Sequence, residues 1–128
     1  MDGGRDLRGL RVLVVEDEIL VAMLIEEMCF DLGCEVVGPV AMLEEALEHS
    51  RQPGFDVALV DMNLGGVKAD PVIAELRGRS IPFAIASGGG EFGHEGEDAL
   101  VLDKPFGFAQ FEECLTQLAT RLAARGSA

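Results

Sequence analysis

The stretch Phe55-Asp56-Val57-Ala58-Leu59-Val60-Asp61 decides the fold class and introduces the first candidate functional residue. Residues 57–60 form a short, continuous apolar run with β-branched members and no helical spacing, which is typical of a strand buried on both faces. Asp61 comes where this strand ends, and the pair Gly65-Gly66 that follows indicates a loop. Ligands of open parallel sheets bind beyond the carboxyl ends of the strands, so Asp61 is a candidate site residue. A single acid at this point could equally cap the next helix.

Four further apolar runs predict strands at residues 10–15, 34–40, 81–86 and 99–103, and helical patterns alternate with them at residues 19–32, 42–49, 71–76 and 108–124. Strand and helix in alternation predict an α/β fold, a doubly wound five-stranded parallel sheet with helices on both faces. The segment 88–98 contains five glycines in eleven residues. Glycine disfavours helix, so we expect a loop with at most one helical turn here, and a fourth helix that is short or missing.

The helix predicted at residues 19–32 carries more apolar side chains than one buried face requires. The residues at the spacing of one buried stripe are Val21, Leu24, Ile25, Met28 and Leu32, and those off the stripe are Leu20, Ala22, Met23 and Phe30. We expect burial of both sides of this helix inside the domain, with a partner-docking surface as the alternative.

Length and composition are those of one globular domain. The chain has 128 residues, 48% of them hydrophobic, and we expect an N-terminal tail at residues 1–9, one domain at residues 10–124 and a C-terminal tail at residues 125–128. The net charge of −13 argues against direct contact with nucleic acid, because phosphates would be repelled. No apolar run is long enough to span a membrane and the first nine residues have no apolar signal core, so we expect a cytoplasmic protein. The three cysteines lack the spacing of a zinc or redox site.

Polar residues of definite kinds follow four of the five predicted strands. They are Glu16 and Asp17 after the first strand, Asp61 after the third, Ser87 after the fourth and Lys104 after the fifth. A doubly wound sheet brings these strand ends to one edge. The successive carboxylates from residue 16 to residue 18 repel one another, and Mg²⁺, which prefers carboxylate, water and phosphate oxygens, would relieve that repulsion. A solvated acidic start to the next helix is the alternative.

These residue types together suit phosphoryl transfer. A carboxylate can act as the nucleophile that becomes an acyl phosphate, and a metal ion can neutralise the phosphoryl oxygens. A hydroxyl and an ammonium group can bind the remaining oxygens.

Because these residues occur in this order along the chain, residues from about Leu10 to Leu122 resemble the receiver domain of two-component response regulators. The resemblance implies the sheet order 2-1-3-4-5 and a role for each strand-end residue. Asp61 would be the phosphoacceptor, and Glu16 and Asp17 the acidic pair that binds Mg²⁺ together with Asp61. The roles implied for the other three residues are main-chain metal ligand for Asn63, switch hydroxyl for Ser87 and phosphoryl contact for Lys104.

The resemblance also implies partners. A histidine kinase or a histidine phosphotransfer protein would supply the phosphoryl group, and a downstream protein would recognise the changed surface. A homodimer is compatible with this scheme. The only chemistry we expect of the chain itself is its own phosphorylation and dephosphorylation, so we do not expect it to be an enzyme with a separate substrate.

Two features depart from the usual receiver pattern. Val101 stands three residues before Lys104, where the switch aromatic is usual, and the glycine-rich tract replaces most of the usual fourth helix. The segment 83–89 is partly similar to an alphaproteobacterial single-domain subgroup known for a Phe-Ala-Thr-Gly motif, with Ser87 in place of Thr. Receivers fused to histidine kinases share much of this pattern, so the chain could also be a domain excised from a hybrid kinase.

Three other functions remain as alternatives. A haloacid-dehalogenase-like phosphatase also uses an Asp nucleophile with Ser or Thr, Lys and Mg²⁺, but its metal-binding acids follow the lysine. A flavodoxin-like redox module would need a hydroxyl- and glycine-rich phosphate loop after the first strand, where this chain has acids. A receiver fold kept only for docking would not require Asp61, Ser87 and Lys104 together.

Overall fold

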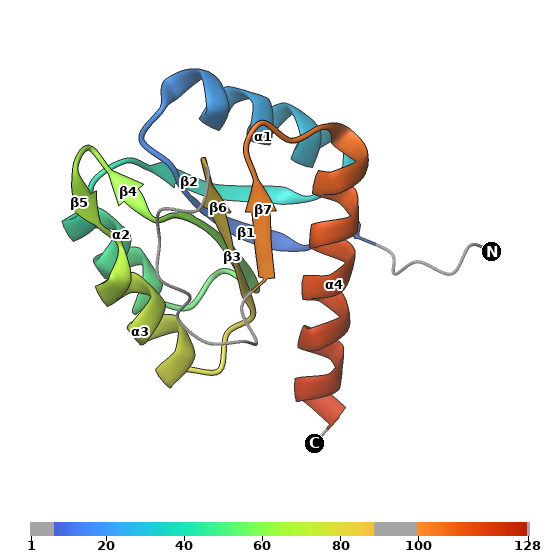
Figure 1. Ribbon diagram of the computed structural model, residues 1–128. Helices are drawn as coiled ribbons and strands as arrows, with labels where there is room; N and C mark the ends of the chain where they lie inside the picture. Colours follow the sequence, from blue (N-terminus) through green and yellow to red (C-terminus); the bar gives the residue numbers. More distant parts are fainter. Residues whose placement is uncertain (1–6, 89–99, 128) are drawn as a thin grey trace.

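A five-stranded parallel sheet forms the centre of the molecule. The computed structural model describes residues 7–88 and 100–127. Its strands are β1 (Arg11–Val15), β2 (Glu35–Val40), β3 (Val57–Asp61), β6 (Phe83–Ser87) and β7 (Leu100–Asp103). They lie in the order β2-β1-β3-β6-β7 (Figure 1). This order confirms the predicted arrangement 2-1-3-4-5, with the stretch that ends on Asp61 as the central strand.

Helices cover both faces of the sheet, as predicted. They are α1 (Ile19–Leu32), α2 (Leu43–Ser50), α3 (Asp70–Gly78) and α4 (Phe108–Ser127). In Figure 1, α1 and α4 lie on one side of the sheet and α2 and α3 on the other, and each pair is in contact. The prediction of a short or missing helix concerns the glycine-rich tract at residues 88–98, and residues 89–98 lie outside the described residues. Residue 99, the predicted start of the fifth strand, also lies outside them.

The alternation of side chains along the strands creates two hydrophobic cores. In β1, Val12 and Val14 enter the core under α1 and α4, whereas Leu13 and Val15 enter the core under α2 and α3. The same alternation holds in β3 and β6, because successive residues of a strand point to opposite faces. Burial on both faces explains why these strands are continuous apolar runs.

Helix α1 buries a stripe that overlaps the predicted one, since Ile25 and Met28 are buried and Val21 and Leu32 pack partly buried against the same core. Its buried residues are Ala22, Ile25, Met28 and Cys29, while Leu24 is 40% exposed. The expectation of burial on both sides is wrong, because an apolar face stays exposed; its residues are Ile19, Leu20, Met23 and Phe30.

The segment after Asp61 is more regular than the predicted loop. Asn63–Leu64 (β4) and Val67–Lys68 (β5) pair as a two-residue antiparallel hairpin around Gly65 and Gly66. The φ angles of the two glycines, +62° and +92°, are typical of a type I′ turn, which needs left-handed backbone at both positions. A glycine pair between short polar-apolar segments is a known hairpin signal, so this hairpin could have been predicted from the sequence.

The chain ends contribute more than the predicted boundaries indicate. Leu7, within the expected tail, is buried in the core under α1 and α4, and its carbonyl lies 3.5 Å from Sγ of Cys34. Helix α4 continues to Ser127. All three cysteines are buried and free. Within residues 7–88 and 100–127, no helix combines the length and apolar character that a membrane span needs.

Candidate functional site

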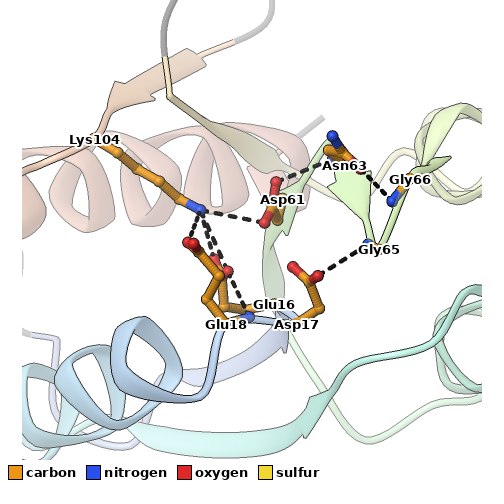
Figure 2. A network of polar contacts seen from close by, with 8 residues as sticks. All are labelled: Glu16, Asp17, Glu18, Asp61, Asn63, Gly65, Gly66 and Lys104. Carbon is orange, nitrogen blue, oxygen red and sulfur yellow. Dashed lines mark hydrogen bonds and ion pairs between the residues drawn. The ribbon is translucent and has the colours of Figure 1, made fainter.

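The candidate site residues meet at the carboxyl edge of the sheet, as the topology requires. Glu16 and Asp17 follow β1, Asp61 is the last residue of β3, and Lys104 follows β7. Because all five strands are parallel, these ends lie at the same edge. Figure 2 shows the side chains of Glu16, Asp61 and Lys104 pointing toward one another, with Asp17 beside them.

The ammonium group of Lys104 is the centre of the cluster. Its Nζ lies 3.2 Å from Oδ2 of Asp61, 3.2 Å from Oε1 of Glu16 and 3.3 Å from Oε1 of Glu18. Burial lowers the pKa of Lys104, but the negative charges of Glu16 and Asp61 outweigh burial and raise the pKa above its usual value. The side chain is only 16% exposed, and because its pKa is raised it stays positively charged beside Asp61.

Glu16 is the most deeply buried carboxylate of the group. The residue is 3% exposed, and its Oε2 accepts a hydrogen bond from the backbone N–H of Glu18 at 3.1 Å. Its Oε1 is buried and, among the described residues, accepts no hydrogen bond; the 3.2 Å contact with Lys104 is an ion pair that lacks hydrogen-bond geometry. Burial, together with a side-chain hydrogen bond to Asp61, raises the pKa of Glu16 from 4.5 to about 7. Without a further cation, the buried site therefore favours a proton on Glu16 below about pH 7.

The β4–β5 hairpin holds the other side of the site. The backbone N–H of Gly65 donates a hydrogen bond to Oδ2 of Asp17 at 2.9 Å, and the N–H of Asn63 donates to Oδ1 of Asp61 at 3.0 Å. The side-chain oxygen of Asn63 in turn accepts from the N–H of Gly66 at 2.7 Å. The hairpin therefore orients both Asp17 and Asp61 through main-chain donors (Figure 2).

Ser87 ends β6, the strand next to β3. Its residue is 3% exposed, and its carbonyl accepts the N–H of Lys104 at 2.7 Å. In the sheet register, Asp61 is opposite Ala86, so Ser87 is one residue further toward the site edge. The next residue, Gly88, lines an open pocket of about 310 Å³ whose other lining residues include Asp17, Asp61, Asn63 and Lys104.

The donor set fits a hard divalent cation. One oxygen each from Glu16, Asp17 and Asp61 lies within 4.8 Å of the others. Carboxylate oxygens are the ligands that Mg²⁺ prefers, and Mg²⁺ commonly uses few protein carboxylates with water and phosphate completing the shell. The buried Oε1 of Glu16, which accepts no hydrogen bond from the described residues, is the kind of atom that a cation would satisfy.

Two features of this site were not predicted from the sequence. Glu18 was noted only as the third acid of a run, yet it pairs with Lys104 in space. The contact between Gly65 and Asp17 joins residues 48 positions apart. A short-range pattern carries no signal for either contact, although the glycine pair could have indicated a hairpin.

Comparisons with known proteins agree with this geometry. A scan against protein families matches residues 12–110 to the response regulator receiver domain. The two-component response regulator PhoP of Pseudomonas aeruginosa is 33% identical over 120 residues, which cover 88% of this chain and 52% of PhoP. The phyllosphere-induced regulator PhyR of Methylorubrum extorquens is 28% identical over 91% of this chain and 47% of its own length. The chain thus spans about half the length of the curated relatives it matches.

Solved structures give the same result. The solution structure of SdrG from Sphingomonas melonis Fr1 is 37% identical, with a TM-score of 0.79 over 87% of this chain and 97% of SdrG. The receiver domain of a sensor histidine kinase from Pseudomonas aeruginosa PAO1 is 25% identical, with a TM-score of 0.76 over 88% of this chain and 98% of that domain. That crystal structure has a magnesium ion coordinated in the active site cleft.

Proposed function

The chain belongs to the response regulator receiver domain family, and from this premise we propose that Asp61 accepts a phosphoryl group from a phosphohistidine of a partner protein. The chain is a phosphorylation-dependent signalling domain of the two-component type. The family leaves the haloacid-dehalogenase alternative without support. The position of Asp61 supports its assignment as the acceptor. Asp61 ends the central strand, its Oδ2 lies 3.2 Å from the ammonium of Lys104, and it belongs to the group of acids that could hold a metal ion.

The transfer follows from this arrangement. An oxygen of Asp61 attacks the phosphorus atom, the bond from phosphorus to the donor imidazole breaks, and the imidazole nitrogen retains the electron pair. The N–H of Asn63 holds Oδ1 of Asp61 in place, so the carboxylate is oriented before the donor arrives. Lys104 offers three N–H donors beside Asp61 and can bind a phosphoryl oxygen as the charge develops there.

Glu16, Asp17 and Asp61 would hold Mg²⁺, with the main-chain carbonyl of Asn63 as the further protein ligand that the family resemblance implies. When bound, Mg²⁺ supplies positive charge that neutralises the phosphoryl oxygens. The carboxylates of Glu16 and Asp17 approach the site from the loop after β1, and Asp17 lines the open pocket together with Asp61 and Lys104. The chemistry proposed for the chain is limited to gaining and losing its own phosphoryl group.

Phosphorylation of Asp61 would be transmitted to a partner protein through a change in the surface of the domain. Ser87, the switch hydroxyl of this proposal, lies one residue past the register partner of Asp61, and its carbonyl is bonded to the backbone of Lys104. A new dianionic group on Asp61 therefore acts on β6 and on the turn after β7. We propose that a histidine kinase or a histidine phosphotransfer protein donates the phosphoryl group, and that a downstream protein partner binds the phosphorylated domain. We propose the cytoplasm as its location.

Intact-mass measurement with acetyl phosphate tests the acceptor. The protein should gain one phosphoryl group in the presence of Mg²⁺, and the gain should disappear when EDTA replaces Mg²⁺. Asp61→Asn should show no adduct. Asp56→Asn is the matched control, because Asp56 lies on the same chain segment at the opposite end of β3 and is bonded to Arg11.

An adduct on Asp61→Asn as abundant as on the unchanged protein would contradict the assignment of Asp61. An adduct that forms equally in EDTA would contradict the metal site and leave the acceptor in place. Loss of the adduct in Asp56→Asn as well as in Asp61→Asn, with both variants folded by circular dichroism, would also argue against a specific acceptor at residue 61.

A further inference from the structure

A second pocket lies at the opposite edge of the sheet from Asp61. It is formed where β6 begins and where α3 and α4 end, and its volume is about 370 Å³. Figure 1 shows the ends of α3 and α4 on the side of the molecule away from the tips of the strand arrows. The lining residues are Arg77, Ser80, Ile81, Pro82, Phe83, Arg121 and Arg125, hereafter the arginine pocket.

The charge of the arginine pocket is opposite to that of the chain. Three of the ten Lys and Arg residues line it, and none of its lining residues among residues 7–88 and 100–127 is an Asp or a Glu. The positive charge of Arg125 also helps to lower the pKa of Asp56. Burial raises the pKa of Asp56, but hydrogen bonds from Arg11 and the more distant charge of Arg125 outweigh burial and lower it. The carboxylate of Asp56 is already paired with Arg11 at 3.1 Å.

Two of the three guanidinium groups are positioned by the pocket wall. Nη1 of Arg125 donates a hydrogen bond to the carbonyl of Ser80 at 2.6 Å. The guanidinium carbon of Arg77 lies 5.5 Å from the ring centre of Phe83, a cation–π contact. These contacts orient the two guanidinium groups along the wall, and each group has five N–H donors in a fixed planar arrangement.

The backbone under Arg125 is held in an uncommon conformation. Ser80 has a φ of +58°, where an L-residue other than glycine, Asn or Asp is rare. Two hydrogen bonds hold it there, from the N–H of Ser80 to the carbonyl of Arg77 and from the N–H of Ile81 to the carbonyl of Leu76. This is the Schellman ending of α3, with Ser in place of the usual glycine. The pocket wall is therefore a fixed turn that presents a carbonyl to Arg125.

We propose that the arginine pocket binds an acidic segment of a partner protein, with carboxylates on the arginines and an apolar side chain on the wall formed by residues 81–83. The size favours a segment over a single small anion, because the pocket has the volume of about ten waters and falls in the range of sites for larger ligands. The planar guanidinium matches a carboxylate with two parallel hydrogen bonds. The proposal concerns the edge away from Asp61 and does not depend on phosphorylation.

A nuclear magnetic resonance titration of the full, unphosphorylated ¹⁵N-labelled chain tests this proposal. The probe is a peptide of alternating glutamate and leucine, and the matched control is the same peptide with glutamine for glutamate. We expect the glutamate peptide to shift the backbone amide signals of Ser80, Ile81, Phe83, Arg121 and Arg125, with little change near Asp61. Added salt should weaken the binding, and the glutamine peptide should bind at least about tenfold more weakly.

Variants identify the residues that bind. Arg77→Gln, Arg121→Gln and Arg125→Gln should each weaken the peptide about two- to fivefold, and the triple variant should abolish the shifts. Arg51→Gln removes the same charge from an arginine that does not line the pocket and should leave the affinity unchanged.

Three outcomes would overturn the proposal. One is the absence of shifts at the pocket with the glutamate peptide. Another is equal weakening by Arg51→Gln, which would show a nonspecific effect of net charge. The third is binding of inorganic phosphate as tight as that of the peptide, which would make the pocket a site for a free anion. Because the unphosphorylated chain is used, none of these outcomes bears on Asp61 as the acceptor.

Discussion

At the scale of single residues, Lys104 connects the acids at the site edge. Its ammonium contacts Glu16 and Glu18, which lie together after β1, and Asp61 at the end of β3 (Figure 2). Asp61 and Lys104 could be predicted as site residues from their places after apolar strands. The pairing with Glu18 could not, because it depends on how the chain between β1 and α1 turns, and three successive acids give no indication of which one faces the lysine.

Replacing Lys104 should destabilise the metal-free protein. In Lys104→Gln the carboxylate of Asp61 loses its cation while it stays largely buried, and the pKa of Glu16 rises further because the charge of Lys104 no longer lowers it. We expect a loss of about 1 to 3 kcal/mol in the free energy of unfolding at pH 7. Urea unfolding in EDTA measures this. Lys68→Gln, on the exposed strand β5, is the control and should change the free energy by less than about 0.5 kcal/mol. Equal effects of the two variants would show that Lys104 does not stabilise the acids.

The raised pKa of Glu16 gives opposite pH trends for stability and for metal binding. The pKa is about 7 in the folded protein against 4.5 as the usual value, so the folded state keeps a proton that the unfolded chain releases. The metal-free protein should therefore lose stability as pH rises from about 4.5 to 7. Mg²⁺ needs the ionised carboxylate, so its affinity should rise over the same interval, by up to tenfold per pH unit below the pKa.

Urea unfolding in EDTA and calorimetric titration of Mg²⁺, each at several pH values, measure the two trends. Glu16→Gln should remove the contribution of this carboxyl to both of them. A Mg²⁺ affinity that is flat between pH 5 and 7 in the unchanged protein would contradict the position of Glu16 among the ligands.

At the scale of elements, the β4–β5 hairpin is what the sequence analysis described least well. It was predicted as a loop, and it proves to be a tight turn whose amides hold Asp17 and Asp61. The prediction for helix α1 failed in part for a different reason, namely the choice of its buried face. Several choices of stripe satisfy the helical spacing in an apolar-rich helix, and the structure buries Ala22 and Cys29 and leaves Leu24 exposed. Periodicity alone does not distinguish between these choices.

The hairpin turn should be sensitive to substitution by alanine. Gly66 has a φ of +92° and open space around its Cβ position, so Gly66→Ala adds backbone strain without a clash. We expect a loss of about 1 to 2 kcal/mol in the free energy of unfolding. Gly78→Ala is the matched control, because Gly78 ends α3 with ordinary φ and open space, and there alanine should stabilise by up to about 1 kcal/mol. Thermal or urea unfolding checks both; a neutral Gly66→Ala would mean that the turn is not held in type I′ geometry.

At the scale of the whole molecule, the sheet separates two cores and two edges. The strands were predictable because burial on both faces makes them apolar throughout, and the parallel order followed from the alternation of strand and helix. Long-range features were not predictable in the same way. Leu7 enters the core from the expected tail, and the arginine pocket unites the ends of α3 and α4, more than 40 residues apart in the sequence. Only the folded chain brings such residues together.

The core under α1 and α4 should depend on Phe111. This residue is fully buried and its ring stacks on Phe106 at 6.0 Å between centroids. Phe111→Ala should cost about 3 to 5 kcal/mol in the free energy of unfolding, since it removes a large side chain and leaves a cavity. Phe108, in the same helix, is 42% exposed, and Phe108→Ala should cost less than about 1 kcal/mol. Urea unfolding of both variants tests the packing, and equal losses would contradict it.

The central claim is that a phosphoryl group is carried by Asp61. Borohydride reduces an acyl phosphate of aspartate to homoserine, so reduction of the phosphorylated protein followed by peptide mass analysis locates the acceptor. We predict homoserine at position 61 alone, in an amount that depends on Mg²⁺. Homoserine at position 17, or an intact phosphoryl group on Ser87 with Asp61 unmodified, would contradict the claim.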